Sequence, residues 1–238
     1  MSTKVKAVVI GNRDYKDKDK LITLYTLEKG KMFCSMRGVR GEKAKLKAAK
    51  EIFCFGEYII EEKGGSVITQ VDIIDPFFSI TGDLDKFYEA CAIIDIVSKV
   101  GTNESNPELF ISLLKALKAI CYDNLPKLYC VNKFLIDIFG SLGYFFLSEK
   151  CSACKSTLGT KRYFNLDIGE LVCPNCRNAT CVSVSQACYA ALKILGGTEY
   201  EKLSSVHIGG GGEVEAFRLL QSNFEWRVGH KFCDIPLI

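Results

Sequence analysis

The sequence predicts a multidomain α+β protein with an N-terminal β-barrel and a C-terminal helical bundle that carries a cysteine-bearing insert. Three observations support this prediction. Five short segments rich in β-branched and aromatic residues lie within the first 75 residues. After Asp75-Pro76 the hydrophobic period lengthens from two to roughly three and a half residues, the helical value. Two Cys-X-X-Cys pairs then interrupt the helical pattern.

Several of the N-terminal segments alternate between apolar and polar residues, which is typical of half-buried strands, although the second does so only weakly. Gly64-Gly65 forms a good two-residue hairpin turn, because both glycines tolerate positive φ. Five short strands in about seventy residues suit a small barrel such as the OB-fold. An SH3-like barrel fits the pattern nearly as well. The expected strands are 4–10, 21–27, 32–37, 52–61 and 67–74.

The helical part begins with apolar residues that share one face between Leu84 and Ile94. Asn106-Pro107-Glu108 is a strong helix start, because Asn caps free N–H groups and Pro suits the first turn. A third helix is expected after Pro126, a fourth between Ser185 and Leu195, and a fifth over about 213–228, with the tail packing back onto the bundle. The predicted domains are a barrel (1–78), a first helical part (79–148), a zinc-binding insert (149–180) and a second helical part (181–238).

The composition favours a cytoplasmic globular protein. Of the 238 residues 48% are hydrophobic, enough for a substantial core, yet no run approaches the roughly 20 apolar residues of a membrane helix. The opening MSTKVKAVVI lacks the apolar region of a secretory signal. In a reducing compartment the 12 cysteines should be thiols or metal ligands. Eight of them are scattered, and we expect them to be small buried hydrophobic residues.

The other four cysteines form two pairs, Cys151/Cys154 and Cys173/Cys176, with eighteen residues (155–172) between the pairs. Two such knuckles can complete a tetrahedral shell of four thiolates, which predicts one structural zinc ion per chain. Four protein ligands leave no open position, so the site should not be catalytic. The alternatives are a pair of redox dithiols or an iron–sulfur cluster.

Positive charge is concentrated near the N-terminus. Residues 1–50 hold 14 Lys+Arg and 5 Asp+Glu, whereas residues 51–238 hold 17 and 23. Such a split indicates a polyanionic partner, with nucleic acid as the leading candidate and an acidic protein or a membrane surface as alternatives. The candidate DNA-binding residues are Arg13, Lys18, Lys20, Arg37, Arg40, Lys43, Lys45 and Lys47.

Aromatic residues in the same region offer surfaces on which unpaired bases can stack. Tyr15 is the best candidate, because it lies in a polar segment. For Tyr25, Phe33, Phe53, Phe55 and Tyr58 core packing is the favoured role.

Enzymatic motifs were not found. The only two histidines, His207 and His230, belong to no nucleophilic triad, and the sequence contains neither HExxH nor a nucleotide-binding loop. Gly209–Gly212 lacks the spacing of a phosphate cradle. The sequence therefore predicts a binding protein without an active site.

A series of short motifs runs along the chain. It begins with Arg13, Tyr15, Asp19-Lys20-Leu21 and Leu24-Tyr25-Thr26, and it continues through Gly30-Lys31 and Arg37-Gly38-Val39-Arg40. It extends over Asn106–Phe110, Leu142-Gly143-Tyr144, the cysteine pairs with Phe164 and Gly169, and Val228–Lys231. In this order the motifs resemble the bacterial RecO family of DNA repair proteins, and the match covers nearly the whole chain.

The resemblance implies an OB-fold barrel, a helical domain and a zinc site at the four cysteines. It also implies binding of single- and double-stranded DNA, strand annealing, and loading of RecA together with RecR and single-strand-binding protein. One departure is the stretch GEKAK after Arg40, where many members have a denser basic run; Glu42 would weaken DNA affinity locally. The alternatives are a zinc-containing enzyme that processes nucleic acid and an RNA-binding zinc-ribbon factor.

Overall fold

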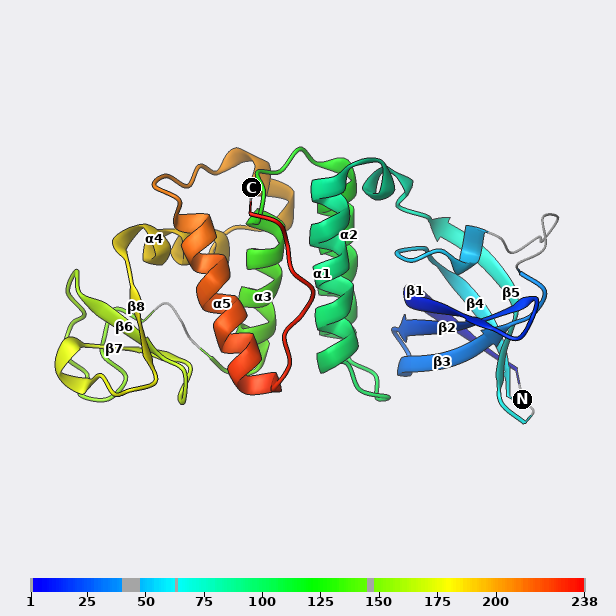
Figure 1. The fold of residues 1–238 in the computed structure, drawn as a ribbon, viewed down its shortest axis with the longest axis horizontal. Coiled ribbons are helices and arrows are strands. Elements are labelled where there is room, and N and C mark those ends of the chain that lie inside the picture. The colour runs from blue at the N-terminus through cyan, green and yellow to red at the C-terminus, as the bar shows by residue number, and fades with distance from the viewer. Residues whose placement is uncertain (1, 40–47, 63, 145–147, 238) are drawn as a thin grey trace. The chain divides into compact units, whose positions relative to one another are not determined.

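The computed structural model describes residues 2–39, 48–62, 64–144 and 148–237 (Figure 1). The chain forms two compact units, residues 1–122 and residues 123–238, called here the N-terminal and C-terminal units. The first contains a barrel and two long helices, and the second contains three long helices and a small sheet. No helix among the described residues is long and apolar enough to cross a bilayer.

The predicted barrel is confirmed. Five strands close it in the order β1-β2-β3-β5-β4, and all neighbours are antiparallel except β3 and β5. This is the arrangement expected of an OB-like barrel. The strands are β1 (Ser2–Tyr15), β2 (Asp19–Thr26), β3 (Gly30–Met36), β4 (Phe55–Glu62) and β5 (Ser66–Asp75).

Strand β1 is longer than the predicted 4–10 and pairs with two partners. Residues 2–8 pair with β4, and residues 7–15 pair with β2, with a register shift between Val9 and Gly11. A bulge of this kind bends a strand and increases its twist, which closing a small barrel requires. Gly64 and Gly65 have the predicted positive φ, +69° and +139°, but the predicted two-residue turn was wrong, since three residues separate the paired Glu62 and Ser66.

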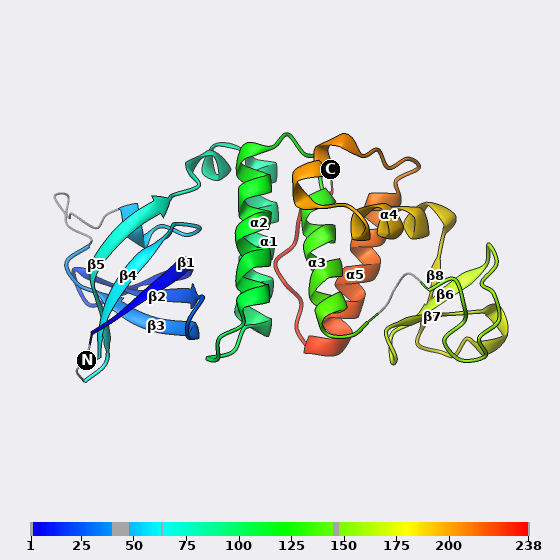
Figure 2. The ribbon, with the colours of Figure 1, turned by 180° about the vertical axis from the view of Figure 1, so that it is seen from behind.

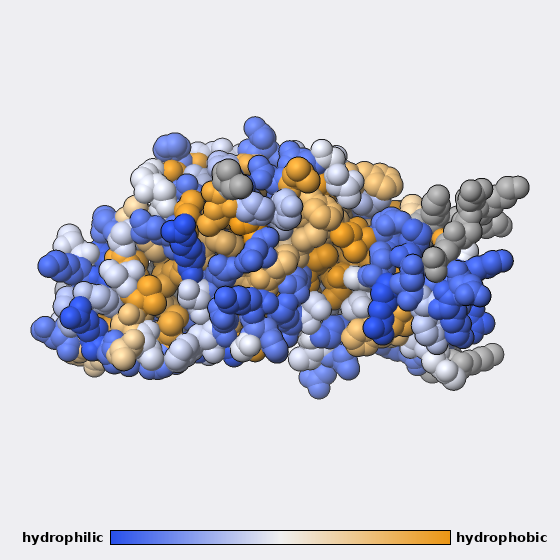
Figure 3. Space-filling view, viewed as in Figure 1, coloured by the Kyte–Doolittle hydropathy of each residue, from blue (hydrophilic) through white to orange (hydrophobic). Residues whose placement is uncertain are grey.

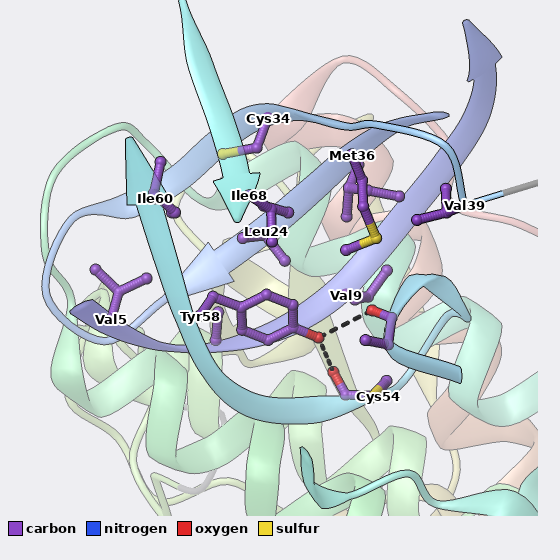
Figure 4. Close-up of a cluster of buried hydrophobic side chains, with 13 residues drawn as sticks. Val5, Val9, Leu24, Cys34, Met36, Val39, Cys54, Tyr58, Ile60 and Ile68 are labelled. Atoms are coloured by element: carbon purple, nitrogen blue, oxygen red, sulfur yellow. Dashed lines mark hydrogen bonds between the residues drawn. The ribbon is translucent and has the colours of Figure 1, made fainter. Parts of the chain in front are cut away.

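Alternating side chains fill the barrel interior. Ile22 and Leu24 of β2 meet Cys34 and Met36 of β3 in one buried cluster (Figure 4). Within it, the Tyr58 hydroxyl donates to the carbonyls of Ala49, at 3.2 Å, and Cys54, at 3.4 Å. A short 3-10 turn, η1 (Ala48–Lys50), supplies the first of these carbonyls. The interior is therefore a packed core rather than a binding cavity.

Two helices complete the N-terminal unit: α1 (Leu84–Val100), preceded by the 3-10 turn η2 (Phe78–Gly82), and α2 (Pro107–Tyr122). The start predicted at Asn106 is confirmed, since its side chain accepts the N–H of Leu109 at 3.0 Å. Phe110 of α2 packs its ring against Tyr25 and Phe55 on the outside of the barrel. These contacts explain why α1 and α2 belong to the same compact unit as the barrel.

The C-terminal unit contains α3 (Tyr129–Ser141), α4 (Gln186–Gly196) and α5 (Gly212–Val228), with the 3-10 turn η4 (Tyr200–Ser205) between the last two. Ser185 caps α4 as predicted, accepting the N–H of Cys188 at 3.0 Å. Phe232 from the tail packs against Phe217 and Phe224 of α5, so the predicted return of the tail is confirmed.

A three-stranded sheet projects from this unit and carries the cysteine pairs (Figure 2). We call residues 148–184 the ribbon. Its strands are ordered β7-β6-β8, with β6 (Arg162–Asn165), β7 (Glu170–Val172) and β8 (Cys181–Val184), and the turn η3 (Pro174–Cys176) holds the second knuckle.

Most of the eight remaining cysteines are buried as predicted. Cys34, Cys54, Cys121, Cys130 and Cys188 lie in the core. Cys91 and Cys181 are half-buried, and the prediction was wrong for Cys233, which is exposed in the tail.

Candidate metal centre and candidate nucleic-acid interface

The four paired cysteines meet in the ribbon. The sulfur atoms of Cys151, Cys154, Cys173 and Cys176 all lie within 4.8 Å of one another. The sulfurs of Cys154 and Cys173 are 3.8 Å apart. A tetrahedral ion with metal–sulfur bonds of about 2.3 Å sets its ligand sulfurs about 3.8 Å apart. The cluster therefore has the dimensions of a four-thiolate metal site.

Each pair sits on a tight turn that the local sequence favours. In the first knuckle the N–H of Lys155 donates to the carbonyl of Cys151 at 2.9 Å, and Lys155 adopts the left-handed conformation at φ +61°. In the second, Pro174 begins the turn, and the N–H of Cys176 donates to the carbonyl of Cys173 at 3.1 Å. Pairing of β6 with β7 brings the second turn back to the first.

Hydrogen bonds stabilise negative charge on the sulfurs of Cys151 and Cys154, whereas hydrogen bonds to Cys154 and Cys173 raise the pKa of the Cys176 thiol to about 12. Burial opposes ionisation of Cys151, but hydrogen bonds from the backbone of Cys154, Cys173 and Ala153 outweigh it and lower the pKa of this thiol to about 6. The bond from the Cys173 N–H to the Cys151 sulfur measures 3.3 Å. The pKa of Cys154 is also lowered, by hydrogen bonding to Ser156. Thiolates are the form in which cysteine binds a metal, so the site fits a soft divalent cation.

Two arginine–tyrosine stacks, which the sequence analysis missed, hold the ribbon against the helices of its own unit. The Arg162 guanidinium of β6 lies 3.9 Å from the ring centre of Tyr189 on α4. The Arg227 guanidinium of α5 lies 3.8 Å from the ring centre of Tyr144 and donates to the carbonyl of Leu166 at 3.1 Å. Stacked pairs separated by 27 and 83 residues leave no local sequence pattern.

The predicted DNA-binding residues divide into described and undescribed groups. Arg13 and Tyr15 lie at the end of β1, Lys18 in the following turn, Lys20 on β2, and Arg37 directly after β3. Antiparallel pairing brings these segments to the same end of the barrel, since Tyr15 pairs with Asp19 and Lys20 pairs with Met36. The others, Arg40, Lys43, Lys45 and Lys47, lie outside the described residues.

Strand alternation assigns the described cations to different faces. Lys20 shares its face with the buried Ile22, and its ammonium lies 3.0 Å from the side-chain oxygens of both Asn12 and Asp14. Only 17% of the Lys20 side chain is exposed. Arg13 follows the opposite alternation, pairing with Leu21 on the outer face, and Arg37 comes one residue after the buried Met36. Both arginines are exposed.

Two aromatic side chains are exposed near these arginines. Tyr15 is 45% exposed, and the Lys16 ammonium lies 5.2 Å from its ring centre. Phe33, for which core packing was predicted, is 57% exposed, so that prediction was wrong. Strand alternation along β3 predicts this exposure, because Cys34 and Met36 face the core and Phe33 therefore faces outward. Much of the barrel surface visible in Figure 3 is hydrophilic.

Comparison with known families identifies the chain. Residues 1–77 match the family model described as Recombination protein O N terminal, and residues 81–233 match Recombination protein O C terminal. The chain belongs to the RecO family. The family boundary falls between β5 and α1, whereas the compact N-terminal unit also includes α1 and α2.

Similar proteins carry one common name. A protein of Clostridium novyi named DNA repair protein RecO is 28% identical over 220 residues, covering 91% of this chain and 86% of that relative. Proteins with the same name in Syntrophomonas wolfei and Clostridium perfringens are 25% and 26% identical, covering 98% and 89% of this chain. They span 94% and 87% of those relatives' own lengths. The family resemblance deduced from the motifs is thus confirmed.

Proposed function

We propose that the protein is a recombination mediator that binds single- and double-stranded DNA through its barrel and anneals complementary strands. The observation that carries this proposal is the pair of exposed arginines, Arg13 and Arg37, at one end of a closed barrel of the RecO family. Cations at such a surface neutralise phosphates and release counterions, which gives affinity for any DNA sequence. They also lower the repulsion between two strands held on one surface, which promotes annealing.

The proposed partners follow from membership in the RecO family. We propose that the protein works with RecR and single-strand-binding protein to load RecA, with RecA as an indirect partner, in the bacterial cytoplasm at the nucleoid. The proposal assigns no catalytic step to the chain. Candidate cations Lys18, Arg40, Lys43, Lys45 and Lys47 would extend the binding surface, while Lys20 would contribute less because Asn12 and Asp14 already bind its ammonium.

The metal proposed for the ribbon is a structural zinc ion, one per chain, held by Cys151, Cys154, Cys173 and Cys176. The support is the donor set: four cysteine sulfurs within 4.8 Å of one another, one pair of them 3.8 Å apart, and backbone hydrogen bonds that favour the thiolate of Cys151. Zinc bound by four protein ligands would tie the two knuckles together and take no part in a reaction.

Charge reversal at the two arginines tests the DNA proposal. For each phosphate that the protein neutralises, the affinity for single strands falls by about 0.7 log units per tenfold increase in salt. Loss of two phosphate contacts in Arg13→Glu/Arg37→Glu should therefore lower this salt slope by about 1.4. Fluorescence anisotropy with single- and double-stranded oligonucleotides across a salt series measures this, and an annealing assay with and without single-strand-binding protein measures the consequence.

A matched control reverses two exposed lysines elsewhere in the same unit. Lys115→Glu/Lys118→Glu on α2 makes the same change in net charge away from the barrel end. We expect it to weaken binding much less at moderate salt. Equal losses in both variants, or unchanged affinity in the arginine variant, would refute the barrel surface as the binding site.

A further inference from the structure

The outer surface of strands β1, β2 and β3 is divided into a covered part and an open part. In the covered part, Val8, Tyr25 and Phe55 lie side by side across three strands, and Phe110 of α2 packs its ring against the two aromatic residues. Lys31, the partner of Tyr25 on β3, donates to the carbonyl of Ser98 on α1 at 2.8 Å. The helices therefore cover the apolar residues of this part.

The next row of outward-facing residues, paired with one another across β1, β2 and β3, contains Gly11, Thr23 and Phe33. The environment of Phe33 differs from that of the covered aromatic residues. Met32 and Cys34, on either side of Phe33, belong to the interior cluster, so the Phe33 side chain must point outward. It is 57% exposed. A large aromatic ring on an open strand costs hydrophobic free energy that a bound ligand would recover.

The neighbours of Phe33 leave room for a flat ligand. Gly11 has no side chain, and a Cβ built there would contact only the Thr23 side chain, at 3.6 Å and beyond. Thr23 is small, so Phe33 is the largest side chain of its row. A planar group can lie against one face of the ring above these two residues.

The row beyond it supplies cations. Arg13, Leu21 and Ser35 are paired there, two residues along each strand from the Phe33 row, a distance of about 7 Å. Arg37 continues β3 in the same direction, and Tyr15 continues β1. An aromatic ring and guanidinium groups at this separation match the two parts of a nucleotide, a planar base and a charged phosphate.

We infer that Phe33 is a stacking platform for an unpaired nucleobase and that it gives the barrel its selectivity for single strands. The inference rests on the proposed function, because Arg13 and Arg37 must hold the adjoining phosphates. A base inside a duplex is stacked on both faces and cannot lie on Phe33, whereas an unpaired base can. Stacking occupies the face of the base and leaves its hydrogen-bonding edge open, so a complementary strand can still pair with it.

Phe33→Ala tests the platform against a matched control. Phe78→Ala removes an equally large side chain that is 63% exposed on η2 of the same unit. Because one base–aromatic stack contributes about 1–3 kcal/mol, we expect Phe33→Ala to lower the affinity for an oligothymidine strand by roughly five- to 150-fold. Affinity for a duplex of equal length should change by less than about twofold, and the salt slope should stay constant because no charge is lost.

A spectroscopic variant reports the stack directly. Trp226 is the only tryptophan, so Phe33→Trp in a Trp226→Phe background places a single fluorophore on the platform. We expect quenching of its fluorescence when the oligothymidine binds and little change with the duplex. The affinity of this variant for the single strand should equal or exceed that of the parent protein. Gly11→Val, which adds bulk beside the ring, should weaken single-strand binding without affecting duplex binding.

The outcomes separate this inference from the proposed function. If Phe33→Ala lowers single-strand affinity selectively while Phe78→Ala does not, the platform is supported. If Phe33→Ala has no effect, or weakens duplex and single strand equally, the platform is refuted, while loss of binding in Arg13→Glu/Arg37→Glu still supports the proposed function. If neither Phe33→Ala nor the arginine variant loses affinity, both are refuted.

Discussion

Side chains of the same charge differ in exposure and contacts because their neighbours differ. Lys20 and Arg37 are both cations at the same end of the barrel, and no local sequence pattern distinguishes them. Lys20 faces Asn12 and Asp14, so part of its charge is already neutralised, whereas Arg37 is exposed. The difference follows from strand alternation, because Lys20 is in step with the buried Ile22 and Leu24.

Two buried tyrosines in the N-terminal unit give a matched test of hydrogen bonding. The Tyr58 hydroxyl donates to the carbonyls of Ala49 and Cys54, whereas the Tyr25 hydroxyl is buried with no hydrogen-bond partner among the described residues. We expect Tyr58→Phe to lower the free energy of unfolding by about 1 kcal/mol, since a buried carbonyl loses its donor. Tyr25→Phe should be neutral or stabilising, because it removes an unsatisfied polar atom.

Chemical denaturation of both variants measures the difference, and a larger loss in Tyr25→Phe than in Tyr58→Phe would contradict it. Alkaline pH adds a second measurement. Burial raises the pKa of Tyr25 from 10.0 to about 12. A raised pKa gives stability that is complete below pH 10 and is lost between pH 10 and pH 12, because the unfolded phenol ionises first. Tyr25→Phe should therefore lose less stability than the parent chain over this interval.

At the scale of elements, local patterns predicted the barrel and the helices well but predicted their ends poorly. Alternation ended the first predicted strand at Ile10, yet β1 continues through Gly11, Asn12 and Arg13 to Tyr15. Pairing with β2 stabilises these polar residues as a strand, and such partners are distant in the sequence. Helix caps were predicted correctly at Asn106 and Ser185, because a cap depends only on residues within the same turn.

The ribbon shows the same division between local and distant information. The spacing of the cysteine pairs predicted that the four sulfurs lie together, and they lie within 4.8 Å of one another. The predicted insert, 149–180, stopped short of β8, which pairs with β6 across sixteen or more residues. The arginine–tyrosine stacks were likewise missed, since each joins residues that are far apart in the chain.

Metal removal should unfold the two cysteine knuckles and leave the barrel folded. The apolar cluster at the knuckles is small, with Cys151, Val172 and Cys173 as its buried members, so bonds to the metal would supply most of the stability of the knuckles. We expect Cys151→Ser to lose the zinc and to become sensitive to protease within 148–184. Elemental analysis and limited proteolysis measure both effects, and chelation of the parent protein should reproduce them.

Cys181→Ser is the control for this experiment. Cys181 packs against the same cluster, but its sulfur lies outside the group of four and is hydrogen-bonded to Asn178. The control variant should retain one zinc ion per chain and resist the protease. A full complement of metal in Cys151→Ser, or its loss in Cys181→Ser, would contradict the assigned ligands.

At the scale of the whole molecule, charge is distributed unevenly between segments and evenly between units. Residues 1–50 carry 14 Lys+Arg and 5 Asp+Glu, and residues 51–122 carry 5 and 12. The C-terminal unit, residues 123–238, carries 12 and 11. The N-terminal unit is therefore polarised, with acidic residues concentrated in β4, β5, α1 and their flanking turns. Repulsion from this acidic part would direct a DNA strand toward β1, β2 and β3.

This distribution predicts that the fragment 1–122 retains the DNA binding of the whole chain. Its barrel has a buried core and no free edge, and the fragment keeps the hydrogen bond from the Tyr122 hydroxyl to Asp75 at 2.9 Å. Because the C-terminal unit is nearly neutral, its removal should change oligonucleotide affinity by less than about threefold and leave the salt slope unchanged. Circular dichroism establishes that the fragment is folded, and anisotropy compares its salt series with that of the full chain.

A folded fragment that binds more than tenfold more weakly would place part of the DNA surface on the C-terminal unit. The same fragment carrying Arg13→Glu/Arg37→Glu should lose binding as the full chain does, because both arginines lie within it.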